Sequence, residues 1–263
     1  MNTISTIIPI NEITPKLEEY FGKALESIKT QKTLPDNVCI VHTPQVKTFL
    51  DEYDFGDLDV TLVENDGDSQ FTSQINLGVD NIKTEWFAVL EIDDEFSNIF
   101  IDNFKKYSSK YDDVETFLPI VVDVNEKGEF LNFTNEAVWA MNFSDKMGYL
   151  DNGCLLKYQN FQTSGMACKV SAFEDIGGFK PSMKLTFVYE FLLRATYNDK
   201  KIMTIPKVGY KHVNMREDSL FWNYRNVESQ VIVPDEAKFW IDTAKKEYFF
   251  TTDRGIKYEA SVE

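Results

Sequence analysis

Acidic side chains follow directly on an apolar run in the first half of the chain. The run WFAVLEI at 86–92 contains Glu91 just before its last residue and leads into Asp93, Asp94 and Glu95. Carboxylates this close together raise one another's pKa unless a positive charge neutralises them. A hard divalent cation such as Mg²⁺ or Mn²⁺ prefers oxygen ligands, and it often binds one or two carboxylates together with phosphates and water. The run therefore predicts a Mg²⁺ or Mn²⁺ site, although acidic residues are also favoured in the solvated first turn of a helix.

Short apolar strands and amphipathic helices alternate ahead of this acidic run. Strands are expected at 4–10, 37–42, 60–63 and 86–92, and helices at 15–30 and 72–82. This alternation is typical of βαβ units that build a mainly parallel sheet. Because ligands bind at the carboxyl ends of the strands in such sheets, the acidic run lies where a ligand is expected.

The second half of the chain has a less regular pattern. We expect a helix near 97–110, a strand at 117–124, a helix over about 186–197 and a strand at 201–206. Residues 130–165 mix aromatic with polar side chains and are expected to be irregular or to form short elements.

Four segments, taken in order, carry a resemblance to a known family. They are ISTIIPIN (4–11), NLGVDNIKTEWFAVLEIDD (76–94), FEDIGGF (173–179) and YEFLLR (189–194). With them, the chain over about 3–220 resembles the inverting, metal-dependent family 2 glycosyltransferases of the GT-A fold. The resemblance implies an α/β fold, the Rossmann-like GT-A fold that binds nucleotide-sugars, with a mainly parallel central sheet flanked by helices.

The resemblance also implies how the chain is divided. Residues 1–233 are expected to form the GT-A domain, with a donor half at about 1–95 and an acceptor half at about 96–233. Residues 234–263 are expected to form a C-terminal helical appendage.

The donor site is expected at the ends of the first strands. By the resemblance, the donor-binding residues are Ile8, Pro9, Asn11, His42, Asn65, Asp66, Asn76, Glu91, Asp93 and Arg216. The family usually ends its second strand with an Asp that reads uracil, whereas this chain has His42 and Thr43 there. The nucleotide base therefore stays open, and a UDP-sugar is the default because it is the commonest donor in the family.

The expected metal ligands are Asp93, Asp94 and His212. Asp93 matches the metal-binding carboxylate of the family motif, and Asp94 matches the acidic residue after it. Glu91 stands where the family usually has the first Asp of the motif. A neutral imidazole at His212 can complete a metal shell, although a single His is often only a hydrogen-bonded or surface residue.

An inverting displacement needs a general base that takes the proton from the attacking hydroxyl. Alignment on Arg194 places Phe187 and Val188 where the family has its catalytic Glu-Asp pair. Glu190 is then the only carboxylate on this helix and is the expected base, with Asp175 as the alternative. Glu190 could instead form an ion pair with Arg194, which lies one helical turn away.

The net charge and the lack of a long apolar stretch argue against a nucleic-acid-binding or membrane protein. The formal net charge of -16 disfavours binding to phosphate backbones and anionic membranes. No stretch approaches the length of a membrane span, so a cytoplasmic protein of a bacterium or of a phage-infected host cell is expected.

Cys39, Cys154 and Cys168 lack metal-ligand spacing and are expected to be buried thiols. Gly177 and Gly178 predict a tight turn with positive φ.

Three functions are compatible with these features. The first is a glycosyltransferase that moves a sugar from a nucleotide-sugar to a hydroxyl of a glycan, a protein or a modified nucleic-acid base, as in phage-type DNA glycosylation. The second is a catalytically impaired GT-A module that only binds a nucleotide-sugar or glycan. The third is a nucleotidyltransferase, which usually opens with a Gly-rich, basic phosphate loop that is missing after ISTIIPI.

Overall fold

The computed structural model describes residues 2–136, 148–157, 160–181, 183 and 186–214. Arg216 and the helical appendage expected at 234–263 lie outside these residues. Within the described part of the chain, none of the helices has the length and apolar character that crossing a membrane requires.

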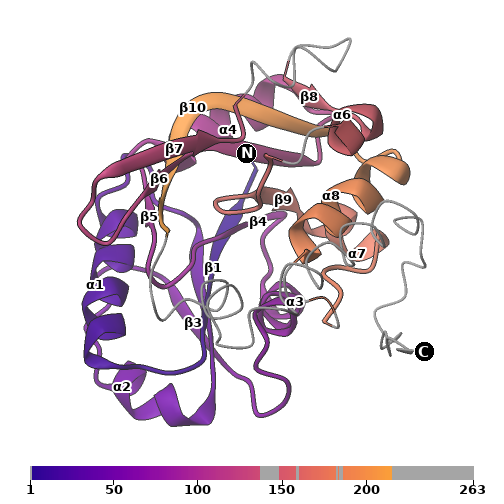
Figure 1. Cartoon of the computed structure of the whole chain (residues 1–263). Coiled ribbons are helices and arrows are strands. Elements are labelled where there is room, and N and C mark those ends of the chain that lie inside the picture. Colours follow the sequence, from indigo (N-terminus) through magenta and orange to yellow (C-terminus); the bar gives the residue numbers. More distant parts are fainter. Residues whose placement is uncertain (1, 137–147, 158–159, 182, 184–185, 215–263) are drawn as a thin grey trace, which may run out of the picture.

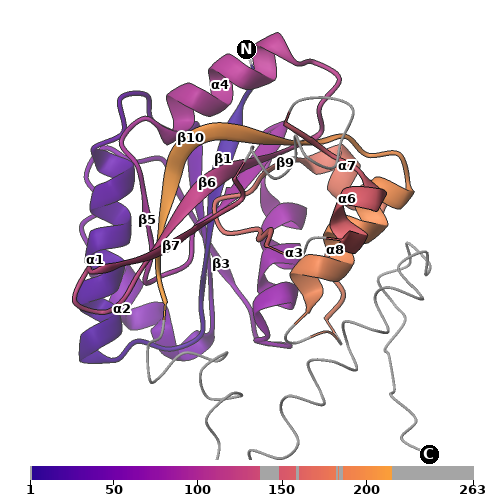
Figure 2. The same ribbon diagram turned by 45° about the horizontal axis from the view of Figure 1, so that its top comes forward.

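One mixed β-sheet forms the centre of the molecule, and helices cover both of its faces (Figure 1, Figure 2). The strand order is β3-β2-β1-β4-β9-β6-β10-β5, with β7 paired to β6 and β8 paired to β10. The strands are β1 (Ile4–Ile10), β2 (Asn37–His42), β3 (Val60–Glu64), β4 (Trp86–Val89), β5 (Glu95–Phe96), β6 (Thr116–Val124), β7 (Phe130–Thr134), β8 (Tyr149–Leu150), β9 (Ala167–Lys169) and β10 (Ile202–Val213). The expected α/β fold with a central sheet between helices is confirmed.

Strands β1 to β4 form the parallel part of the sheet. β1 pairs in parallel with β2 and β4, and β2 pairs in parallel with β3. Their carboxyl ends lie side by side, because Ile10 is the partner of His42 and His42 is the partner of Glu64. All seven residues of β1 are buried, as expected for a strand whose two faces are both covered. This arrangement creates the edge at which the sequence places the donor site.

The other part of the sheet is mixed. β9 lies antiparallel to both β4 and β6, β10 is parallel to β6, and β5 is antiparallel to β10. The expected strand at 86–92 ends already at Val89, and the chain then turns before β5. The strand expected to end at 206 continues to Val213 through bulges between Ile205 and Tyr210. These antiparallel additions are why the sheet is mixed rather than mainly parallel.

Helices pack on each face through alternate residues of the strands. Ile4 and Ile8 of β1 face one core together with α1, α2 and α4, whereas Ile7 faces the second core together with α3, α6, α7 and α8. The helices are α1 (Pro15–Lys29), η1 (Pro44–Val46), α2 (Lys47–Asp51), α3 (Phe71–Asn81), α4 (Phe100–Lys110), α6 (Asn152–Lys157), α7 (Val170–Asp175) and α8 (Phe187–Tyr197). This alternation follows from the two-residue period of a strand.

Local signals in the sequence explain the start of α1 and the turn after α7. The Thr14 hydroxyl accepts a hydrogen bond from the Leu17 amide at 3.3 Å, and Pro15 occupies the first helical turn. Gly177 and Gly178 have φ values of 80° and 64°, which confirms the predicted turn. All three cysteines are free and buried, also as predicted.

Candidate metal centre and donor site

Three of the expected polar residues meet at the end of β4. Glu91, Asp94 and His212 each offer a ligand atom, and these atoms lie within 4.8 Å of one another. Glu91 and Asp94 belong to the turn that follows β4, which is closed by a 3.1 Å hydrogen bond from the Asp94 amide to the Glu91 carbonyl. The pairing of β5 with β10 brings this turn to His212, which lies far away in the sequence.

Asp94 is fully buried and is held by β10 through both of its carboxylate oxygens. Oδ1 accepts a hydrogen bond from the Val213 amide at 2.8 Å, and Oδ2 lies 2.9 Å from Nδ1 of His212. A carboxylate bound to one ring nitrogen fixes the orientation of a histidine and leaves the other nitrogen for a metal. The side chain of His212 is 21% exposed, so the imidazole is within reach of a ligand.

Apart from His212, the cluster consists of the two carboxylates of Glu91 and Asp94, so the histidine lies in a strongly negative environment. Burial disfavours the charged imidazolium, but Asp94, Glu91 and Asp123 attract it more strongly, and together they raise the pKa of His212 to about 10. His212 is therefore protonated at neutral pH. A metal ion bound through this imidazole would displace the proton.

Two residues that the sequence did not single out hold Glu91 in place. The Ser164 hydroxyl donates a hydrogen bond to Oε1 of Glu91 at 3.0 Å, and the Glu91 amide donates to the phenol oxygen of Tyr210 at 3.0 Å. Tyr210 is fully buried, and burial raises the pKa of its phenol well above the ordinary value. Asp93 lies half-buried in the same turn but is not a member of the three-residue cluster, so its metal contact stays a prediction.

The expected donor residues of β1 and β2 lie at the same edge of the sheet. Ile8 and Pro9 are buried within β1, and Asn11 is exposed just beyond its end. The Asn11 carbonyl accepts a 2.5 Å hydrogen bond from the Thr43 hydroxyl, which ties the end of β1 to the end of β2. His42 is buried, and its Nδ1 lies 2.9 Å from the Thr43 carbonyl.

The residues after β3 form a polar turn at this edge. Oδ1 of Asn65 accepts a hydrogen bond from the Gly67 amide at 3.0 Å, and Nδ2 donates to the Asp68 carbonyl at 2.9 Å. Asn65 thus shapes its own loop, as Asn often does in turns. Asp66 is exposed beside it. The donor role of both residues stays a prediction.

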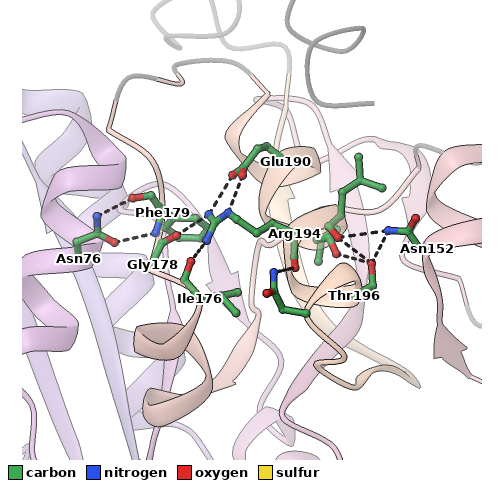
Figure 3. A network of polar contacts seen from close by, with 11 residues as sticks. Asn76, Asn152, Ile176, Gly178, Phe179, Glu190, Arg194 and Thr196 are labelled. Carbon is green, nitrogen blue, oxygen red and sulfur yellow. Dashed lines mark hydrogen bonds and ion pairs between the residues drawn. The ribbon is translucent and has the colours of Figure 1, made fainter. Parts of the chain in front are cut away.

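Asn76 connects α3 with the turn after α7, as Figure 3 shows. Its Nδ2 donates to the Phe179 carbonyl at 2.8 Å, and its Oδ1 accepts from the Phe179 amide at 2.9 Å. The residue is buried, so this contact gives it a structural role independent of any donor.

The expected base Glu190 forms a buried ion pair with Arg194 (Figure 3). The two contacts are 2.6 Å from Nε to Oε1 and 3.0 Å from an Nη to Oε2. Arg194 also donates to the carbonyls of Ile176 and Gly178, and so holds the glycine turn. The ion pair considered from the sequence is therefore present. Asp175, the alternative base, has a 65% exposed side chain and pairs with Lys200 at 2.5 Å.

Other residues beside the cluster were missed for a physical reason. Tyr210, Ser164 and Gln162 come from segments distant in sequence, and no local pattern connects them to the acidic run. Asp123 did leave a signal, since it is a charged residue within the apolar strand FLPIVVDV.

Comparison with known proteins gives a remote similarity. No family model matches the chain. Over 136 residues, 49% of this chain, it is 27% identical to the teichoic acid poly(glycerol phosphate) polymerase of Staphylococcus epidermidis, and the match covers 18% of that protein.

Solved structures of S. aureus TarS have a similar fold. TarS 1–349 has a TM-score of 0.62 at 14% identity, over 99% of this chain and 75% of that chain. The complex of TarS 1–349 with UDP has a TM-score of 0.63 at 14% identity, over 94% of this chain and 70% of that chain. The complex with UDP-GlcNAc has a TM-score of 0.62 at 12% identity, over 94% and 71%. The likeness concerns the fold, and it confirms the expected GT-A-like architecture.

Proposed function

We propose that this chain is a glycosyltransferase that moves a sugar from a UDP-sugar to an acceptor hydroxyl with inversion, using Mn²⁺ or Mg²⁺. The observation that carries the proposal is the cluster of Glu91, Asp94 and His212 at the carboxyl edge of the parallel strands. Ligands bind at this edge in open α/β sheets. The similarity to the TarS structures with UDP and UDP-GlcNAc supports a nucleotide-sugar donor.

The residues of the cluster fit a divalent cation. Two carboxylates and an imidazole form a mixed oxygen and nitrogen donor set, which suits Mn²⁺ better than Mg²⁺, because Mg²⁺ favours oxygen almost exclusively. Glu91 and His212 would hold the ion together with Asp93. Asp94, predicted from the sequence as a further ligand, has both oxygens bonded to β10 and would instead orient the imidazole. When bound, the cation neutralises the charge that develops on the departing diphosphate.

The protein side chains have separate tasks in this proposal. The polar ends of β1, β2 and β3 bind the nucleotide, with His42, Asn65 and Asp66 nearest to the base. Glu190 is the proposed general base, since it is the carboxylate that α8 contributes. Each of its oxygens retains a second lone pair that can accept the proton of the acceptor hydroxyl. Asp175 is the alternative base.

The acceptor is proposed from the curated relative. Its name, a teichoic acid poly(glycerol phosphate) polymerase, favours a hydroxyl of a glycan or polyol phosphate polymer over a protein or a modified DNA base. The match covers 18% of that protein. We also propose that the protein is cytoplasmic, that residues 1–233 form the GT-A domain and that residues 234–263 form a helical appendage.

The test is sugar transfer with and without metal. Radiolabelled UDP-GlcNAc and UDP-glucose are incubated with poly(glycerol phosphate), a protein mixture and hydroxymethylated DNA, in Mn²⁺, Mg²⁺ or EDTA. We expect labelled sugar on the polymer only when a divalent cation is present, and an Asp93→Ala enzyme should transfer no label. Full activity of Asp93→Ala, or of the wild type in EDTA, would refute the metal-dependent mechanism. Asp57→Asn, at an exposed carboxylate, is the matched control.

The base requires a separate test. Loss of general base catalysis should reduce the transfer rate of Glu190→Gln about 10²- to 10⁴-fold while UDP binding is kept. Wild-type transfer by this variant would show that Glu190 is not the base, and the same assay on Asp175→Asn would then examine the alternative.

A binding module without catalysis is the second candidate. The observation that favours it is that both oxygens of Glu190 already accept hydrogen bonds from Arg194. Calorimetry that detects UDP-sugar binding, together with no transfer or hydrolysis over the whole acceptor panel, would support this function.

A further inference from the structure

Asp123 is a buried carboxylate next to the metal cluster. It lies in β6 and is only 2% exposed. β6 pairs in parallel with β10, and Asp123 is the register partner of His212. Partners on adjacent strands point to the same face of a sheet, so the two side chains are neighbours.

One oxygen of this carboxylate lacks a hydrogen bond. Oδ1 is buried and has no hydrogen-bond partner among the described residues. A buried polar atom without a partner costs free energy, and a buried charge costs more. Such an atom therefore needs an explanation, and a bound ligand that supplies a donor is one.

Two sets of neighbouring side chains, His212 on one side and Gln162 with Ser164 on the other, lie between Asp123 and the acidic residues of the cluster. Burial raises the pKa of Asp123, while His212 and a hydrogen bond from Gln162 lower it and Asp94 raises it. Oε1 of Gln162 in turn accepts a 3.5 Å contact from the Ser164 hydroxyl, which donates to Glu91. Asp123 is thus linked to Glu91 through Gln162 and Ser164, and to Asp94 through His212.

We propose that Asp123 is an outer-sphere residue of the cation site, where its free oxygen accepts a hydrogen bond from a water molecule bound to the divalent cation. This inference rests on the metal site proposed above. Asp123 is not among the three residues whose ligand atoms lie within 4.8 Å of one another, so its contact is indirect. Mg²⁺, when bound by few protein ligands, keeps several waters, and these waters need acceptors.

The experiment measures Mn²⁺ binding and stability on the same variants of the full chain. Calorimetry with Mn²⁺ alone, without nucleotide, compares wild type, Asp123→Asn and the control Asp57→Asn. We expect Asp123→Asn to weaken Mn²⁺ binding about 10- to 100-fold, as is typical for outer-shell partners of a metal. Thermal unfolding in EDTA should show an unchanged or higher Tm, because an unpaired buried carboxylate has been removed.

This opposite response of affinity and stability is what separates the proposal from a structural role. An unchanged Mn²⁺ affinity of Asp123→Asn, or a loss of affinity that is accompanied by a lower Tm, would overturn it. Asp123→Ala, which removes the carboxylate without adding an amide, must show the same loss of affinity and covers the case in which the Asn variant does not fold. If the wild type binds no Mn²⁺, the metal site itself fails. If the wild type binds and both variants match it, only the role of Asp123 fails.

Discussion

Two groups of charged residues, one buried and one partly buried, differ in how their charge is balanced. At α8, the carboxylate of Glu190 is matched by Arg194, and the remaining donors of Arg194 reach backbone carbonyls. At the end of β4, Glu91 and Asp94 lie together with a single histidine, and the buried Asp123 adds a further carboxylate. The first group is satisfied by the chain itself. The second has an excess of negative charge, which is what a site for a cation requires.

The largest expected effect on stability comes from removing the positive charge that balances Glu190 in α8. Arg194→Met leaves Glu190 buried without its partner, which should lower the free energy of unfolding by about 3–5 kcal/mol. Urea denaturation followed by circular dichroism measures it. The double variant Glu190→Leu with Arg194→Met should recover much of the loss, because no unpaired charge remains. A loss below about 1 kcal/mol for Arg194→Met, the usual limit for an exposed pair, would mean that the pair is not buried in solution.

A smaller effect is expected at the end of β4, where we propose that a bound cation balances the negative charge. Asp94→Asn removes the carboxylate that orients His212, and Mn²⁺ affinity should fall about 10- to 100-fold. Calorimetry with Mn²⁺ gives the dissociation constant, and Asp57→Asn serves as the control. Wild-type affinity in Asp94→Asn would contradict the carboxylate and histidine pair as the core of the site.

The hydrogen bonds from Asn76 of α3 to Phe179, after the turn of Gly177 and Gly178, involve no charged group. Their loss should therefore lower the unfolding free energy less than the loss of the ion pair. Asn76→Ala removes both hydrogen bonds to the buried backbone of Phe179, and we expect a loss of about 1–3 kcal/mol in unfolding free energy. Urea denaturation checks the value. If stability is unchanged while UDP binding is lost, Asn76 contacts the donor directly, as the sequence resemblance implies.

The smallest effect is expected at the ion pair of the exposed Asp175 with Lys200. Asp175→Asn should change the unfolding free energy by no more than about 1 kcal/mol, because the Asp175 side chain is largely exposed to solvent. Its transfer rate should equal that of the wild type if Glu190 is the base. A large loss of rate at unchanged stability would instead assign the base to Asp175.

The parallel half of the fold could be predicted from the sequence, and the mixed half only in part. β1, β2 and α1 begin and end close to the predicted residues, because their apolar periodicity and caps are local signals. β5, β8 and β9 have only two or three residues, and their antiparallel pairing depends on partners far away in the chain. No window of the sequence carries enough pattern to find them.

The candidate site was predictable in its residue types but not in its contacts. Glu91, Asp94 and His212 were all named from the sequence, and they do meet in space. That Asp94 binds Nδ1 of His212, and that Ser164 binds Glu91, follows only from the way β10 and the segment before β9 pack against the turn. The roles of Asp93 and Glu190 come from local motifs alone, and Asp93→Ala and Glu190→Gln test them.

The three-residue strand β9 also determines how the chain can be cut. It lies far beyond residue 95 in the sequence, yet it pairs with β4 on one side and with β6 on the other. A fragment of residues 1–95 would leave the buried, apolar β4 as an open strand edge, and such edges promote aggregation. The segments before and after residue 95 thus form one folding unit through β9, so we expect soluble expression to require the chain through this strand.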